Sequence, residues 1–338
     1  MDRKGEGGLI VLTGYVARVR SGAYGFGRQI GVQSVSDALG AISKSIEMGG
    51  KVSPLYREPN KYLLPLERQI EAYRREDPPP TPQLAVLVLV AECMFIKGKC
   101  KRSTPQLTAT GELALIVFYF LLRVGEYTAT ERRYASETRT VQFTVGDISF
   151  WRDGVLLRKS NTKSILTAEE ATMYLTNQKN GKKNGLIHHE ATDIDGKGLC
   201  PVRELALRVY HMLENGGNET SLLWEYWSDG KWWHVTPTDM GEAIKTSIVD
   251  LGLPSQGITL NDVGTHSLRA GGAMALKLNG ICDTTIKKAG RWRSMAFLQY
   301  IHNQIGHLAA GVSSPMKNKV PFRNIKGMSK LIHGVRRD

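Results

Sequence analysis

The chain has 338 residues, of which 41% are hydrophobic and 23% are charged. This composition is typical of a folded protein and excludes a disordered chain, and the length favours two domains over one. The net charge of +13 favours a polyanionic partner, because each lysine or arginine that meets a phosphate releases bound counterions.

The first region, residues 10–77, predicts a small helical unit. Apolar residues recur at helical spacing in VLTGYVARVR, SVSDALGAISKSIEMGG and NKYLLPLERQIEAYRRED, and Gly49 and Gly50 close the second of these helices. The segment EDPPPTPQ follows and contains four prolines. Because proline cannot lie inside a helix, this segment predicts a linker.

The segment QLAVLVLVAECMFIKGK begins the second region. Glu92 interrupts it, so it predicts a buried helix and not a membrane span, and no membrane partner is expected. The polar N-terminus carries no secretory signal, which predicts an intracellular location, nuclear if the source is eukaryotic and otherwise cytoplasmic or in the nucleoid.

The rest of the second region predicts an α+β domain that is mainly helical and contains one small antiparallel sheet. TPQLTATGELALIVFYFLLRVGEYT is a strongly apolar helix with a threonine near its start as a cap. RTVQFTVGDISF, GVLLRKS and ATMYLTNQ are rich in β-branched and aromatic residues and predict strands. LIHH predicts the strand that returns after the turn KNGKKNG. RELALRVYHMLENGG is helical again, and helices dominate to about residue 310.

Three features of this region are better explained by structure than by function. The tryptophan-rich segment 224–233 either stacks nucleobases or forms a packed hairpin, and we favour the hairpin. His188 and His189 resemble metal ligands, but neighbours on a strand point to opposite faces, so no zinc site is expected. The four cysteines contain no Cys-x-x-Cys pair, so we expect reduced thiols.

A group of cationic side chains and a tyrosine is harder to explain as structure alone. His266 and Arg269 are three residues apart, so they share one face of a helix. Gly271 and Gly272 follow and allow another element to approach closely.

The other members of this group come from distant parts of the chain. Arg123 ends the apolar helix, where a buried charge needs a partner, and Glu126 is the obvious one. Lys179 opens the turn KNGKKNG, and Tyr300 ends RWRSMAFLQY. Two arginines, a histidine, a lysine and a tyrosine, without a pair of carboxylates for a metal, fit the attack of a tyrosine on a phosphodiester.

Each side chain has a role in such a reaction. The arginines hold the non-bridging oxygens with forked donors and stabilise the charge of the transition state. A phenol with a pKa near 10 is a weak nucleophile, and nearby arginines favour its phenolate form. His266 can exchange a proton, and Lys179 can protonate the leaving 5′ oxygen. A covalent phosphotyrosine stores the bond energy, so neither ATP nor a metal is needed.

These motifs resemble, in order, those of the tyrosine recombinases, the phage-integrase-like DNA breaking-rejoining enzymes. Four boxes over roughly residues 85–310 carry the resemblance: LLRVGE with Arg123, YLTNQKNGK with Lys179, HSLRAGG with His266 and Arg269, and AGRWRSMAFLQYI with Tyr300. The segments GRW and AFLQYI look most similar to those of recombinases from eukaryotic mobile elements.

One position departs from the family pattern. The family usually has histidine or tryptophan directly after the glycine of the last box, whereas here Arg291 follows Gly290 and Trp292 comes next. Either side chain can donate to a phosphate oxygen, and we prefer Trp292, with Arg291 as the alternative.

The resemblance implies the domain organisation and the partners. It implies a helical core-binding, SAM-like DNA clamp over 1–77 that is shorter than usual, a linker over 78–84, a catalytic domain over 85–312 and a basic tail over 313–338. It further implies double-stranded DNA as substrate, a 3′-phosphotyrosyl intermediate, no cofactor or metal, and a homotetramer on paired DNA sites. Contacts to the DNA backbone are expected from Lys182, Lys183 and Arg28. Two alternatives stay open: an inactive or domesticated DNA-binding relic of a mobile element, and a type IB topoisomerase-like enzyme.

Overall fold

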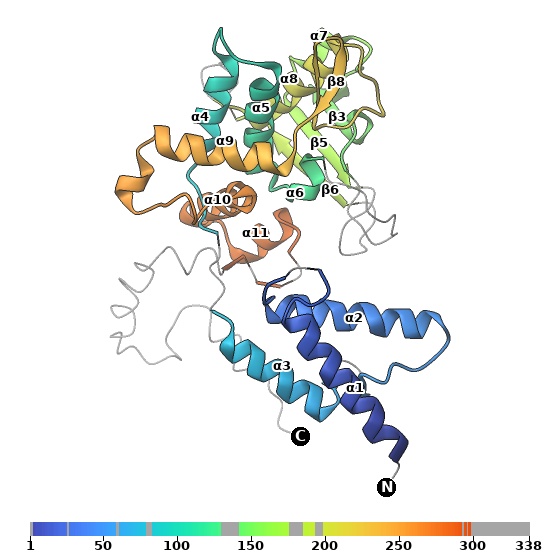
Figure 1. Ribbon diagram of the computed structural model, residues 1–338. Helices are drawn as coiled ribbons and strands as arrows, with labels where there is room; N and C mark the ends of the chain where they lie inside the picture. Colours follow the sequence, from blue (N-terminus) through green and yellow to red (C-terminus); the bar gives the residue numbers. More distant parts are fainter. Residues whose placement is uncertain are drawn as a thin grey trace, which may run out of the picture. The chain divides into compact units, whose positions relative to one another are not determined.

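The computed structural model describes residues 3–25, 27–58, 61–78, 83–129, 142–175, 185–192, 199–292, 294–295 and 297–298. The chain divides into two compact units, residues 1–81 and 82–338. The expected fold class, mainly helical with small antiparallel sheets, is confirmed (Figure 1). No helix in the described ranges is long and apolar enough to span a membrane.

The described part of the first unit contains three helices and a short hairpin: α1 (Arg3–Arg20), α2 (Val32–Met48), β1 (Tyr56–Glu58), β2 (Lys61–Tyr62) and α3 (Leu64–Glu76). Its core consists of apolar side chains from the three helices and from the segment before the hairpin: Val16, Val19, Val35, Leu39, Leu55, Leu66 and Ile70. Pro65 lies in the first turn of α3, where a missing N–H leaves no helical hydrogen bond unmade. Arg20 pairs with Asp77, which also accepts a 2.6 Å hydrogen bond from the N–H of Val32 and so joins α1, α2 and the end of α3.

The second unit is built from helices of very different lengths. They are α4 (Val88–Lys99), α5 (Pro105–Phe120), α6 (Val124–Tyr127), α7 (Thr162–Ile165), α8 (Pro201–Glu214), α9 (Pro237–Asp250), α10 (Thr265–Leu278) and α11 (Asp283–Ala289), with 3₁₀ turns η1 (Val145–Asp147) and η2 (Leu253–Gln256).

In the described part of the second unit, the strands form one four-stranded antiparallel sheet and one hairpin. The sheet has the order β4-β3-β5-β6 and consists of β3 (Ile148–Arg152), β4 (Val155–Leu156), β5 (Glu170–Leu175) and β6 (Gly185–Glu190). The hairpin joins β7 (Glu225–Ser228) and β8 (Lys231–His234). Trp227 and Trp232 face each other across it with ring centroids 5.4 Å apart, which confirms the packed hairpin expected for the tryptophan-rich segment.

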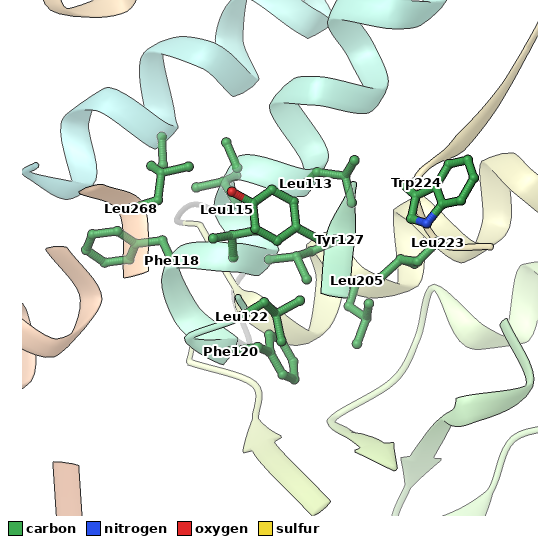
Figure 2. Close-up of a cluster of buried hydrophobic side chains, with 14 of the residues drawn as sticks. Leu113, Leu115, Phe118, Phe120, Leu122, Tyr127, Leu205, Leu223, Trp224 and Leu268 are labelled. Atoms are coloured by element: carbon green, nitrogen blue, oxygen red, sulfur yellow. The ribbon is translucent and has the colours of Figure 1, made fainter. Parts of the chain in front are cut away.

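Helix α5 forms the centre of the second unit (Figure 2). It begins as predicted, because the Thr104 hydroxyl accepts a 3.2 Å hydrogen bond from the N–H of Leu107 and caps the helix. Apolar side chains surround it on several sides, from α6, α8, α10 and the loop before β7: Tyr127, Leu205, Leu268, Leu223 and Trp224.

The end of α5 differs from the sequence-based expectation. The helix stops at Phe120, because Leu121 adopts a left-handed conformation with φ 50°. The chain then restarts as α6, and Arg123 is the residue that precedes its first turn. Arg123 therefore begins a short new helix and does not end the apolar one.

Candidate active site

The first arginine box forms a compact ion pair at the start of α6. The backbone N–H of Arg123 donates to Oε2 of Glu126 over 2.8 Å, and its Nη1 donates to Oε1 over 3.2 Å. Glu126 is completely buried, whereas the Arg123 side chain keeps 19% of its surface exposed. The pairing expected from the three-residue spacing is present, and Arg123 remains accessible from one side.

The H-x-x-R box lies on α10, as its spacing predicted. His266 is exposed in the first turn, and its backbone N–H donates to Oε1 of Gln83 over 3.1 Å. Arg269 lies further into the helix and is 6% exposed. The box therefore presents one accessible imidazole and one buried guanidinium on the same helix.

The two glycines after Arg269 set how closely α10 approaches its neighbours. A Cβ atom at Gly271 would lie 2.1 Å from the carbonyl oxygen of Val86, and one at Gly272 would lie 2.2 Å from that of Phe118. Only glycine leaves room for these backbones to meet. The close approach expected from the sequence is therefore present: α10 packs closely against α5 and against the segment before α4.

The two arginine boxes converge on the turn that follows α11. Arg269 donates to the carbonyls of Leu121 and Gly290, and Nη2 of Arg123 donates to the carbonyl of Arg291 over 3.0 Å. The guanidinium groups of Arg123 and Arg269 are therefore held by consecutive carbonyls of one turn. This turn lies in the box that leads to Tyr300.

Arg291 completes the cluster from a left-handed backbone conformation, with φ 58°. Its Nη1 and Nη2 donate to Oε1 and Oε2 of Glu126 over 2.8 and 3.0 Å, and Nη2 also donates to the carbonyl of Leu121 over 3.0 Å. Burial alone would raise the pKa of Glu126, but the charge and hydrogen bonds of Arg291 and Arg123 outweigh it and lower that pKa. At neutral pH Glu126 is therefore an anion that lies against Arg123 and Arg291.

Trp292 contacts the other arginine. The guanidinium carbon of Arg269 lies 4.3 Å from the centre of the Trp292 ring, which is a cation–π distance. A Cβ atom at Gly290 would lie 1.5 Å from this ring, so the glycine is what lets the indole fold back. Phe297 is fully buried and also contacts Trp292, with ring centroids 5.3 Å apart. Both candidates for the family's histidine or tryptophan position therefore contact the arginine boxes. Arg291 does so through Glu126, and Trp292 does so through Arg269.

Several residues expected in the site lie outside the described residues: Tyr300, Lys179, Lys182 and Lys183. The strands on either side of Lys179 are described, and Leu175 of β5 pairs with Gly185 of β6. Arg28 belongs to the first unit and is exposed.

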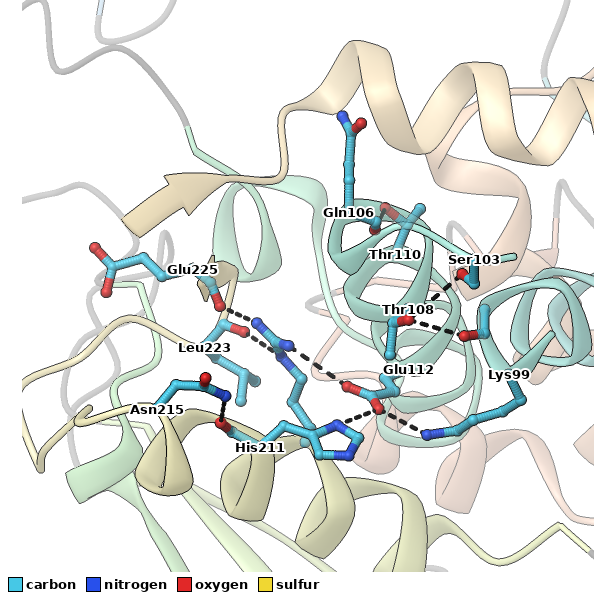
Figure 3. Close-up of polar contacts among 12 residues, drawn as sticks. Lys99, Ser103, Gln106, Thr108, Thr110, Glu112, His211, Asn215, Leu223 and Glu225 are labelled. Atoms are coloured by element: carbon cyan, nitrogen blue, oxygen red, sulfur yellow. Dashed lines mark hydrogen bonds and ion pairs between the residues drawn. The ribbon is translucent and has the colours of Figure 1, made fainter. Parts of the chain in front are cut away.

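Sequence reasoning missed a second buried ionic cluster, which joins α5 to α8 (Figure 3). Glu112 is fully buried; its Oε1 accepts from Lys99 over 3.0 Å and from Nδ1 of His211 over 2.7 Å, and its Oε2 lies 3.4 Å from Nη1 of Arg208. Burial would raise the pKa of Glu112, but the bond to His211 and the charge of Arg208 lower it. The available signal was a single glutamate inside the apolar run GELALIV.

The described residues contain no group of three or more histidine, cysteine, aspartate or glutamate side chains that could hold a metal ion. His188 and His189 lie on β6 and have separate partners, on β5 and α5. Nδ1 of His188 lies 2.9 Å from the Thr172 hydroxyl, and Nε2 of His189 lies 3.0 Å from the Tyr119 carbonyl.

Comparison with known proteins gives a likeness of fold without a likeness of sequence. No protein-family model matches the chain, and no curated protein sequence matches it. The chain is similar to the XerH site-specific recombinase bound to palindromic difH substrate in a post-cleavage complex, with a TM-score of 0.50 and 13% identity over 90% of this chain and 72% of that chain. The pre-cleavage XerH complex gives a TM-score of 0.43 and 13% identity over 88% and 75% of the two chains. The Tn1549 transposon integrase in complex with circular intermediate DNA gives a TM-score of 0.42 and 11% identity, over 89% of this chain and 84% of that chain. The first of these shows a shared α+β fold.

Proposed function

We propose that this protein is a site-specific DNA recombinase or integrase that cleaves and rejoins DNA through a tyrosine. The observation that carries the proposal is the meeting of Arg123 and Arg269 on consecutive carbonyls of the turn that leads to Tyr300. The shared fold with XerH, which is bound to its difH substrate, supports double-stranded DNA as the partner, and so does the net charge of +13.

In the proposed reaction, the phenol oxygen of Tyr300 attacks the scissile phosphorus. The bond from phosphorus to the 5′ oxygen breaks, and the phosphate becomes attached to the tyrosine on the 3′ side. Arg123 and Arg269 hold the non-bridging oxygens and stabilise the charge that builds up on them. His266 accepts the phenol proton, Lys179 gives a proton to the 5′ oxygen, and Trp292 supports the phosphate beside Arg269.

Rejoining is the reverse of this step, with a 5′ hydroxyl attacking the phosphotyrosine. The bond energy is kept in the covalent intermediate, so the cycle needs neither ATP nor a metal. Exchange between two DNA sites requires paired duplexes, and a homotetramer on two sites is the expected assembly. In this proposal the first unit contributes the core-binding contacts to DNA.

The test is to trap the covalent intermediate on nicked duplexes from a pool of DNA sequences. The nick lets the short 5′ fragment diffuse away, so a protein–DNA adduct that survives detergent should accumulate. Tyr300→Phe should form no adduct. Tyr210→Phe, a half-buried tyrosine on α8, is the matched control and should form adduct at the wild-type rate. DNA binding without any adduct would refute the enzymatic proposal.

A second candidate is a DNA-binding relic that has lost turnover. The observation that favours it is Arg291, which stands where the family usually has histidine or tryptophan and which binds Glu126 with both Nη groups. Salt-sensitive DNA binding without an adduct is the expected result for such a protein. A topoisomerase-like activity would instead give the adduct together with relaxation of supercoiled DNA by a monomer.

A further inference from the structure

We propose that Arg291 is a positioning residue that neutralises the buried carboxylate of Glu126, so that Arg123 keeps its positive charge for the scissile phosphate. This inference rests on the proposed function. It assigns to Arg291 a role different from donating to the phosphate itself.

The described contacts of the Arg291 side chain are with buried groups and not with the surface. Its two Nη groups bind both oxygens of Glu126 and the carbonyl of Leu121. The side chain is only 8% exposed, and its Nε is buried without a hydrogen-bond partner among the described residues. A donor left unpaired in this way is unfavourable for stability, which is typical of a side chain retained for function. Arg291 therefore acts on the phosphate through Glu126 and Arg123.

The charges of the cluster explain why this matters. Arg123 and Arg291 bind the anion Glu126, and Arg269 is held beside them by the carbonyls of Leu121 and Gly290. Three cations and one anion leave two positive charges in this cluster. Glu126 lies against Arg123 through a side-chain and a backbone hydrogen bond. Without Arg291, Glu126 would cancel the charge of Arg123, and Arg269 alone would face a transition state that carries an extra negative charge.

The backbone at Arg291 serves the same arrangement. With φ at 58°, the residue turns both its carbonyl and its side chain toward α6, where the carbonyl accepts from Arg123 and the guanidinium binds Glu126. The left-handed conformation is unfavourable for arginine and tolerated by glycine. Arg291→Gly therefore allows this backbone conformation and removes the whole charged side chain, which separates the role of the charge from that of the turn.

The experiment is a charge-restoring pair of substitutions, Arg291→Gln and Glu126→Gln, measured by single-turnover cleavage of the nicked substrate. Arg291→Gln should slow cleavage by roughly 10- to 100-fold, the effect of one nearby charge at an effective dielectric constant near 20. The double variant again has two net positive charges, and it should recover most of this loss. Arg291→Lys keeps the charge but cannot bind both oxygens of Glu126, so its rate should lie between those of wild type and Arg291→Gln. Arg291→Gly should be as slow as Arg291→Gln.

Two further measurements make every outcome decisive. DNA affinity should change by less than about threefold in all of these variants, because the Arg291 side chain is only 8% exposed and a single charge is a small part of a DNA interface. Inorganic phosphate, titrated into the same variants, should bind more weakly to Arg291→Gln and regain affinity in the double variant. If the double variant stays as slow and as weakly binding as Arg291→Gln, Arg291 acts on the phosphate directly and the inference is wrong. Failure of the wild-type protein to form an adduct would overturn the proposed function alone, because the phosphate titration still tests the charge compensation.

Discussion

Gly272→Ala is the substitution that most directly connects the fold to the candidate site. Its added Cβ would lie 2.2 Å from the carbonyl oxygen of Phe118 and 2.6 Å from a methyl group of Leu121. Since real Cβ atoms essentially never approach within 3.0 Å, α10 has to move away from α5 by about 0.8 Å. The neighbouring atom is backbone, so a side-chain rotation cannot remove the clash.

Two consequences follow, with different magnitudes. Overpacking of this kind costs about 1–3 kcal/mol in the free energy of unfolding. The same movement carries Arg269 away from the Leu121 carbonyl, and a misplacement of about 1 Å in a catalytic group costs roughly 100-fold in rate. We therefore expect a moderately destabilised protein whose cleavage is slowed far more than its stability is reduced.

Both quantities can be measured separately. All six tryptophans lie in the second unit, so their fluorescence during urea unfolding reports on that unit. The cleavage rate comes from adduct formation on the nicked substrate, measured without urea at a temperature where the protein is folded. Gly241→Ala on α9 is the control: no atom lies within 4 Å of its added Cβ, and it should stabilise the unit by about 0.4–1 kcal/mol. Wild-type stability and wild-type cleavage in Gly272→Ala would refute the reasoning.

Three other predictions address the buried charges and the chemistry. Glu112→Gln leaves the buried Arg208 without its anion, so the free energy of unfolding, measured in urea, should fall by about 3 kcal/mol. Glu242→Gln, at an exposed position of α9, should change it by less than about 0.5 kcal/mol, and equal effects of the two substitutions would contradict the assigned role. Burial raises the pKa of Glu204 to about 7, so its contribution is favourable below the unfolded-state pKa and is lost as the pH rises toward 7. Glu204→Gln should therefore be more stable than wild type at pH 8 and show a flatter stability profile between pH 5 and 7, and an unchanged profile would count against it. Adduct formation should be the same with and without EDTA, because arginines supply the positive charge in the proposed reaction; loss of the adduct in EDTA would show that a metal takes part.

The sequence predicted the elements well where a local pattern carried the information. Helical spacing identified α1, α2, α3, α5 and α10, and β-branched runs identified the strands of the sheet. The pair formed by Arg123 and Glu126 was also predictable, because Glu126 follows Arg123 by three positions at the start of a short helix.

The sequence could not predict what depends on a single backbone angle or on a distant partner. Leucine rarely adopts a left-handed conformation, so nothing in LLRVGE indicated that α5 ends at Phe120. The pairing of Arg291 with Glu126 joins two boxes far apart in the chain, and only the folded arrangement of α6 and α11 brings them together. For that reason Arg291 was expected to be a candidate phosphate donor and was not expected to bind Glu126.

The scaffold of the arginine cluster is largely main chain. Arg269 is held by the carbonyls of Leu121 and Gly290, and Arg123 is held in part by the carbonyl of Arg291. Every amino acid supplies the same carbonyl oxygen, so mutations that replace the side chains around such a cradle can accumulate while its geometry persists. The positions of these guanidinium groups therefore depend less on which side chains surround them than on the path of the main chain.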